Sequence, residues 1–201
     1  MSIKLFLAAA TAATMFAAPA LAQDNPGLQV YGGALLGLDH VVLKANGASA
    51  GKDGFAYGGV VGIDSSVGAN TRLGVEAEVM GATTSEGYYL DAANNGSLDA
   101  GRDLYIGVRA GVYAAPQLLA YVKGGYTNAR FNLNVVDQGN AYNFGSNLDG
   151  YRLGVGAEYG NKVRLRLEYR FSHYGNAHYQ GADLGIHAER HQVLAGLLYG
   201  F

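Results

Sequence analysis

The chain has 201 residues, with 14 Lys and Arg against 16 Asp and Glu, 31 glycines, 15 tyrosines and no cysteine. A formal net charge of −2 argues against the basic face that nucleic-acid binding requires, so we expect no nucleic-acid partner. Without cysteine the chain can form neither a disulfide nor a lipid-modified cysteine. This length favours a single domain, and the many glycines and tyrosines favour strands over helices.

The first 22 residues predict an export signal. A short basic opening, Met1–Lys4, precedes an apolar run from Leu5 to Ala18, and Ala20-Leu21-Ala22 places small residues at the −3 and −1 positions of a cleavage site. This order is typical of a secretory signal peptide rather than of a buried N-terminal helix. We therefore divide the chain into a signal peptide, 1–22, and one domain, 23–201. No second apolar run of about 18 residues follows, so we expect no transmembrane helix.

Eight later segments alternate between apolar and polar residues with the period of a β-strand. In the clearest, 163–171, apolar side chains at odd positions alternate with Arg164, Arg166, Glu168 and Arg170. A helix would scatter these charges around its surface, whereas a strand puts them on one side. The first segment is the weakest, because its Gly and Leu residues do not fix which face is apolar. The predicted strands are 28–38, 54–64, 72–80, 102–113, 118–128, 148–159, 163–171 and 191–201.

The connections between these strands alternate in length. Three are short, 65–71, 114–117 and 160–162, and four are long and polar, 39–53, 81–101, 129–147 and 174–189. Short turns at one end and long loops at the other are typical of outer-membrane barrels, with the turns in the periplasm and the loops outside the cell. The sequence therefore predicts an all-β fold: an eight-stranded, antiparallel, up-and-down transmembrane β-barrel.

A soluble barrel of the lipocalin kind would also alternate, with its apolar face turned inward. Two features favour the inverted arrangement. No charged residue stands mid-strand on the predicted apolar faces, where Arg or Lys at the bilayer midplane costs about 2–4 kcal/mol. Aromatic residues also gather at both ends of these faces, as in the two aromatic girdles of membrane barrels. They are Phe55, Tyr57, Tyr126, Tyr151, Tyr169 and Phe171 towards the long loops, and Tyr159, Tyr199 and Phe201 towards the short turns.

Two segments also resemble a known family. The ending Leu194–Phe201 is similar to the terminal strand of outer-membrane barrels, and 167–175 (LEYRFSHYG) resembles the penultimate strand of the opacity-type "porin family", which shares the eight-strand plan of OmpA and OmpX. The resemblance implies a location in the bacterial outer membrane, among its lipid and lipopolysaccharide. It also implies insertion by the barrel-assembly machinery, with Leu197, Tyr199 and Phe201 as the C-terminal assembly signal. Family members often have surface or adhesive roles, which implies a host or surface ligand for the long loops; we expect a monomer.

The inward faces carry seven basic and five acidic residues. Eight strands leave an interior that side chains can fill, and charges buried there need partners. We favour a lumen closed by ion pairs; the alternative is a narrow, low-conductance pore. The predicted lumen set is Asp64, Arg72, Glu76, Glu78, Arg109, Lys123, Arg152, Glu158, Arg164, Arg166, Glu168 and Arg170.

Enzymatic and metal chemistry find little support in the sequence. His173-Tyr174-Gly175-Asn176-Ala177 matches the His-x-Ser-Asn-Ala signature of lipid A deacylases except that Gly175 stands where the nucleophile belongs. Ser172 cannot replace it, because adjacent strand residues point to opposite faces. We therefore expect no enzyme and no catalytic residue, with a lipid A-modifying enzyme as the remote alternative.

Two clusters of possible metal ligands lie in the long loops. His173, His178, His187 and His191, with Asp183 and Glu189, follow no rigid ligand spacing. Asp91, Asn94, Asn95, Asp99 and Asp103 lack the ordered pattern of a calcium loop. We expect no metal and no cofactor. The function that the sequence favours is structural or surface-interacting, in the cell envelope.

Overall fold

The structure, a computed structural model, describes residues 27–45, 48–83, 85–91, 94–137, 140–175, 178–179, 182–183 and 186–201. The predicted signal peptide, 1–22, lies outside these residues. In the described part of the chain, no helix is long and apolar enough to cross a membrane.

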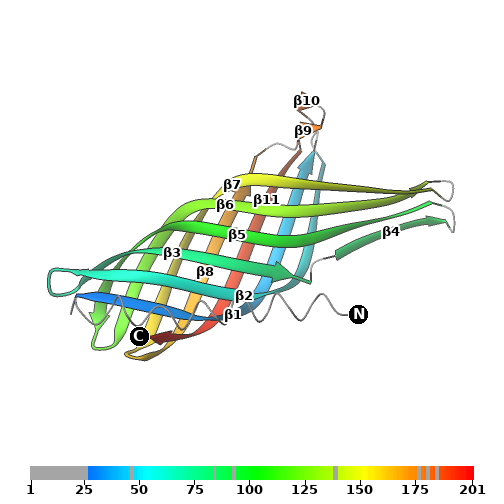
Figure 1. The fold of residues 1–201 in the computed structure, drawn as a ribbon. Helices are drawn as coiled ribbons and strands as arrows, with labels where there is room; N and C mark the ends of the chain where they lie inside the picture. The colour runs from blue at the N-terminus through cyan, green and yellow to red at the C-terminus, as the bar shows by residue number, and fades with distance from the viewer. Residues whose placement is uncertain are drawn as a thin grey trace.

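The described strands form one closed antiparallel barrel (Figure 1). Its strands are β1 (Leu28–Ala45), β2 (Ala48–Val67), β3 (Thr71–Ala82), β4 (Ser85–Asp91), β5 (Asn94–Ala115), β6 (Leu118–Asp137), β7 (Asn140–Gly160), β8 (Val163–Tyr174) and β11 (Ile186–Gly200). Both β3 and β4 pair with β5 and together make one barrel strand, so the barrel has eight. It closes where β11 pairs with β1, and the short strands β9 (His178–Tyr179) and β10 (Ala182–Asp183) pair only with each other. The predicted eight-stranded barrel is confirmed.

Apolar side chains face out of this barrel and charged ones face in. Along β8 the even-numbered residues are buried, whereas Leu165 and Leu167 are 61% and 62% exposed. Val108, Leu153 and Leu197, on three other strands, are also more than half exposed. This polarity is the reverse of a water-soluble protein and is that of a wall in contact with lipid.

The long connections differ from the prediction, because the strands continue through most of them. The β1–β2 ladder runs up to Ala45↔Ala48, and the β6–β7 ladder up to Asp137↔Asn140. The prediction ended each strand where its apolar alternation ends. Backbone pairing does not require an apolar face beyond the bilayer, and the hydrogen-bonded ladder therefore continues. We call this the long-hairpin end, and the end with turns 68–70, 116–117 and 161–162 the short-turn end.

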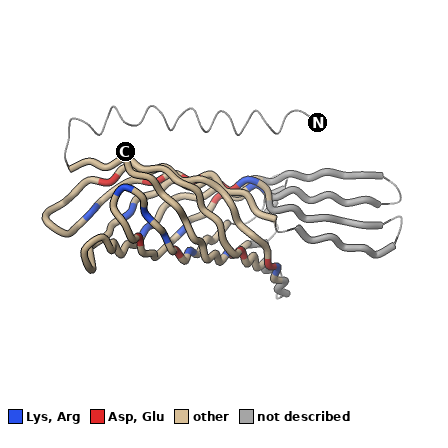
Figure 2. Tube along the Cα trace, turned by 90° about the horizontal axis from the view of Figure 1, so that it is seen from below, with Lys and Arg blue, Asp and Glu red and all other residues tan. Residues whose placement is uncertain are grey.

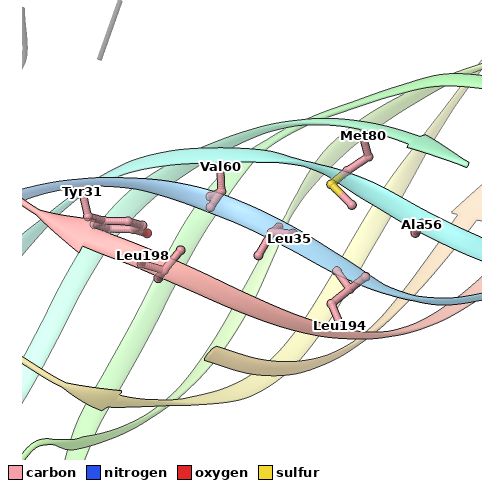
Figure 3. Close-up of a cluster of buried hydrophobic side chains, with 7 residues drawn as sticks. All are labelled: Tyr31, Leu35, Ala56, Val60, Met80, Leu194 and Leu198. Carbon is pink, nitrogen blue, oxygen red and sulfur yellow. The ribbon is translucent and has the colours of Figure 1, made fainter. Parts of the chain in front are cut away.

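The structure also settles the orientation of β1. Leu36 and Leu38 are 63% and 60% exposed on the outer surface, while Tyr31, Leu35 and Asp39 are buried in the lumen. Tyr31 and Leu35, together with inward residues of β2, β3 and β11, form an apolar inner wall beside the seam of the barrel (Figure 3). Its members are Tyr31, Leu35, Ala56, Val60, Met80, Leu194 and Leu198.

Candidate functional site

The candidate site is the lumen, where buried charges of both signs lie along the strands (Figure 2). Because side chains alternate along each strand, these charged side chains point into the lumen. There, charged residues from strands that are not neighbours in the sheet contact one another across the interior. Arg170 of β8, for example, lies 2.5 Å from Glu78 of β3, and neither strand borders the other. The contacts fall into three layers along the barrel axis.

The layer nearest the short-turn end is built on Glu158 and Glu76. Glu158 accepts hydrogen bonds from Arg109 (2.7 Å), Arg164 (2.8 Å) and Arg166 (2.7 Å). Arg166 also donates to Glu76 at 2.7 Å. Each guanidinium thus contacts at least one carboxylate, which is the condition for burying such charges.

Tyrosines line the same layer. The hydroxyl of Tyr31 donates to Glu76 at 2.7 Å, and the Arg164 guanidinium lies 4.6 Å from the centre of the Tyr31 ring. The Arg109 guanidinium lies 4.3 Å from the ring centre of Tyr121. Cations over aromatic faces gain further attraction, which is stronger where water is excluded.

The middle layer surrounds one ammonium group. Nζ of Lys123 lies 2.7 Å from Glu76, 2.5 Å from Glu78 and 2.8 Å from Glu168. The three carboxylates have oxygens within 4.8 Å of one another, close enough to share a metal ion. Lys123 supplies the positive charge at their centre, so the arrangement is an ion-pair cluster built from the chain's own side chains.

The layer nearest the long-hairpin end is built on Asp103. Arg152 lies 2.5 Å and Arg190 3.1 Å from its Oδ2, and Thr127 donates to its Oδ1 at 2.8 Å. Arg190 also makes two hydrogen bonds to Asp39, of 2.6 and 2.8 Å. The lumen is therefore cross-linked from one end to the other.

Among the described residues, buried acids and bases balance. There are seven of each. Asp39, Asp103 and Arg190 lie in this network although the sequence analysis did not place them there. Eleven residues of the predicted lumen set belong to it; Arg72 lies apart, half-buried at the short-turn end, with its guanidinium 5.7 Å from the ring centre of Tyr113. The fourteen are Asp39, Asp64, Glu76, Glu78, Asp103, Glu158, Glu168, Arg109, Lys123, Arg152, Arg164, Arg166, Arg170 and Arg190.

The residues that suggested enzyme chemistry lie on opposite faces of the barrel wall, and several of those that suggested a metal lie outside the described side chains. Ser172 is buried in the lumen and accepts a hydrogen bond of 2.8 Å from Arg152. His173 lies on the other face, with its ring centre 5.4 Å from that of Tyr151. His191 lies 2.8 Å from the hydroxyl of Tyr169, among outer aromatic rings. Nothing is described for the side chains of His178, Asp183 and His187.

The predicted C-terminal signal lies at the seam of the barrel. Leu197 and Tyr199 are 57% and 42% exposed on the outer face, and the rings of Tyr199 and Phe201 meet edge to face at 5.2 Å. The amide of Phe201 donates to the carbonyl oxygen of Val30 at 2.9 Å. The last residue therefore takes part in closing the barrel onto its first strand.

A closed antiparallel barrel with an apolar exterior and a charged interior defines a transmembrane β-barrel protein of the outer membrane. Residues 8–201 match the family model for the outer membrane protein beta-barrel domain. The chain belongs to this family, which places it in the bacterial outer membrane. No curated protein matches it in sequence.

Several solved structures are similar to this chain. Ail, the attachment invasion locus protein of Yersinia pestis, crystallised with the heparin analogue sucrose octasulfate, has a TM-score of 0.50 and 9% identity, over 85% of this chain and 99% of that one. Neisserial surface protein A has a TM-score of 0.48 and 15% identity, over 87% and 97% of the two chains. The outer membrane protease OmpT of Escherichia coli has a TM-score of 0.49 and 13% identity, over 87% and 96%. At these identities the likeness concerns the fold alone.

Proposed function

We propose that the protein is a closed, non-enzymatic surface module of the outer membrane, which holds its lumen shut with ion pairs and presents its long hairpins to the environment. The observation that carries this proposal is the balanced network of fourteen buried charges. Ion pairs between strands on different sides of the barrel, such as Arg166–Glu76 and Arg170–Glu78, occupy the space that a solute would have to cross. Opening either pair would separate opposite charges that are both buried, which is costly.

The long hairpins support the surface part of the proposal. The β6–β7 ladder continues from the outward pair Tyr126↔Tyr151 to Asp137↔Asn140. At about 3.3 Å per residue, this is roughly 35 Å of strand beyond the aromatic girdle. Paired strands of that length form an extended surface beyond the bilayer that a ligand can reach. Ail, which shares the fold, was crystallised with a heparin analogue, and we include sulfated polysaccharides among the ligands to test.

A second candidate function is a narrow, water-filled pore. The observation that favours it is a set of buried polar atoms without a hydrogen-bond partner among the described residues, including the Tyr105 hydroxyl, Arg170 Nη2 and Gln192 Nε2. Buried groups of this kind are commonly satisfied by water. A continuous file of such waters would carry small ions.

Single-channel recording of the refolded protein in a planar bilayer separates the two candidates. The closed module should show no steady conductance. A variant that removes one base and one acid of the central cluster together, E76Q/K123M, should raise ion flux if it folds, whereas D53N, a neutralisation at an exposed carboxylate, should not. Steady, uniform conductance of the unmodified protein would reject the closed lumen and favour the pore.

The surface role needs a separate test. Cells that display the full protein should attach to a heparin-coated surface better than cells that display a variant with residues 131–146 replaced by a short turn. The heat-dependent gel shift of the folded barrel checks that the shortened variant is assembled. Equal attachment by both would reject an adhesive role for this hairpin, and it would not bear on the proposal that the lumen is closed.

A further inference from the structure

A cavity of about 270 Å³ opens at the short-turn end of the barrel. Its walls come from distant parts of the chain: Arg72 at the start of β3, Tyr113 near the end of β5, Lys162 in the β7–β8 turn and Arg164 of β8, with Gln29 and Phe201 beside them. One water takes up roughly 30 Å³ in the liquid, so the cavity has room for a small ligand group and several waters.

The lining of this cavity is cationic. Its lining residues include Arg72, Lys162 and Arg164 and no Asp or Glu. Arg164 belongs to the balanced network, but Arg72 and Lys162 are additional positive charges. The Arg72 guanidinium lies 5.7 Å from the ring centre of Tyr113, which also lines the cavity, and the Lys162 ammonium lies at its outer rim, 5.3 Å from the ring centre of Tyr199. A carboxylate at Phe201 would offset one of these charges and still leave the cavity positive.

Arg164 provides a second, independent observation. Its side chain is only 5% exposed, and its Nη1 faces the network, 2.8 Å from Glu158 and 3.9 Å from Asp64. Its Nε and Nη2 are buried and have no hydrogen-bond partner, and the same holds for Nε of Arg72. Buried donors left without an acceptor are costly, and those on charged groups are the costliest. The guanidinium groups of two residues that line the cavity thus combine positive charge with buried donors that lack acceptors.

We propose that this cavity binds a phosphate group. A guanidinium with two adjacent free N–H directions matches two oxygens of an oxyanion. A phosphate monoester offers three acceptor oxygens and about −1.5 to −2 charges at pH 7, enough to serve Arg72, Lys162 and Arg164 together. A single carboxylate offers two oxygens and one charge. The ion pairs from Arg164 to Glu158 and from Glu158 to Arg109 lie behind the cavity, so the site holds its ligand at the mouth of the lumen.

The phosphate can come from a soluble compound or from a lipid headgroup, and two arms of one experiment separate these sources. In the first, the detergent-refolded protein is titrated with inorganic phosphate by calorimetry, with chloride keeping the ionic strength constant. We expect saturable binding that R72Q and K162Q each weaken by about tenfold or more. The control R102Q removes the same charge at the opposite end of the barrel, at an exposed position, and should bind as the unmodified protein does.

In the second arm, the protein is refolded in phosphatidylcholine vesicles with or without phosphatidic acid, and retained lipid is identified by native mass spectrometry. Loss of retained phosphatidic acid in R72Q/K162Q, but not in R102Q, assigns the lipid source. Binding of inorganic phosphate alone assigns the soluble source. The proposal fails if neither ligand binds, or if the mouth variants bind both as well as the unmodified protein does. Folding of every variant is checked by its heat-dependent gel shift.

Discussion

Arg190 and Asp39 form a bidentate ion pair across the seam of the barrel. Nε of Arg190 lies 2.6 Å from Oδ1 of Asp39, and Nη2 lies 2.8 Å from Oδ2. One residue stands on the last strand and the other on the first, 151 positions apart in the chain. Both are buried in the lumen. The backbone ladder that closes the barrel is therefore reinforced from inside by a bidentate ion pair.

We predict that D39N weakens this closure. Arg190 would keep its contact with Asp103 but lose the charge of its bidentate partner, and breaking a buried pair costs about 3–5 kcal/mol. Urea unfolding in lipid vesicles, read by the gel shift, measures the loss. D53N, which neutralises an exposed aspartate of the β1–β2 hairpin, is the matched control and should unfold at the urea concentration of the unmodified protein. Equal midpoints for D39N and D53N would contradict the seam role.

Removing the central ammonium should turn the middle layer into a cation site. In K123A, the carboxylates of Glu76, Glu78 and Glu168 would lose the positive charge between them, and stability should fall by about 3–5 kcal/mol. Ca²⁺ or Mg²⁺ present during refolding should restore part of it, because clustered carboxylate oxygens are the ligands these ions prefer. The unmodified protein should not respond, and K123A/E78Q should respond less than K123A. A divalent effect of equal size in all three proteins would be a general salt effect and count against the prediction.

The orientation can be read from a chain that has no cysteine of its own. N95C, in the β4–β5 hairpin, should react with a membrane-impermeant thiol reagent on intact cells. N161C, in the β7–β8 turn, should react only after the outer membrane is permeabilised. The motivation is the contrast between short turns and long hairpins at the two ends. Labelling of N161C but not of N95C on intact cells would reverse the topology.

Deletion of Phe201 should reduce assembly. The deletion removes the amide bonded to Val30 and the ring packed on Tyr199, at the point where the barrel must close to leave no unpaired edge in lipid. We expect less folded, heat-modifiable protein in the outer membrane. F55A removes another exposed aromatic, at the opposite girdle, and should be assembled at the normal level. If the deletion and F55A accumulate equally, Phe201 has no special part in insertion.

The predicted export signal can be tested on the mature chain. Cleavage after Ala22 would leave Gln23 as the first residue. N-terminal sequencing of protein from the outer membrane should therefore begin Gln-Asp-Asn-Pro. A sequence that begins at Met1 would show that residues 1–22 are kept.

The fold could be predicted from the sequence because a lipid-facing wall imposes a strict alternation, and 163–171 displays it without exception. The same parity puts Glu76 and Arg166 in the lumen. The same alternation could also have placed Asp103 in the lumen, since it lies an even number of residues from Arg109 on the same strand. It could likewise have placed Arg190 there, since it lies two residues from Gln192. The position of Asp39 in the lumen could not be predicted, because the glycines and leucines of β1 do not show which face of the strand is inward until its register with β2 and β11 is known.

Partner choice in the lumen could not be predicted from strand patterns. Whether Arg170 meets Glu78 or Glu76 depends on the stagger and tilt of all eight strands, which set the heights at which β3 and β8 face each other. The length of the hairpins was hidden for a different reason. Outside the bilayer both faces of a strand can be polar, so the ladder from Tyr126 to Asp137 continues without the alternation that reveals strands within the membrane.

The equal numbers of buried acids and bases also determine how the barrel responds to voltage. A charge that crosses a membrane potential gains or loses about 2.3 kcal/mol per 100 mV, and voltage-sensitive proteins use an excess of one sign to do mechanical work. In the described lumen an electric field pulls seven cations one way and seven anions the other with equal total force. Shifting the network as a body therefore does no electrical work. The described network has no net gating charge, and the lumen that we propose to be closed should not be opened by moving this network as a body in either polarity.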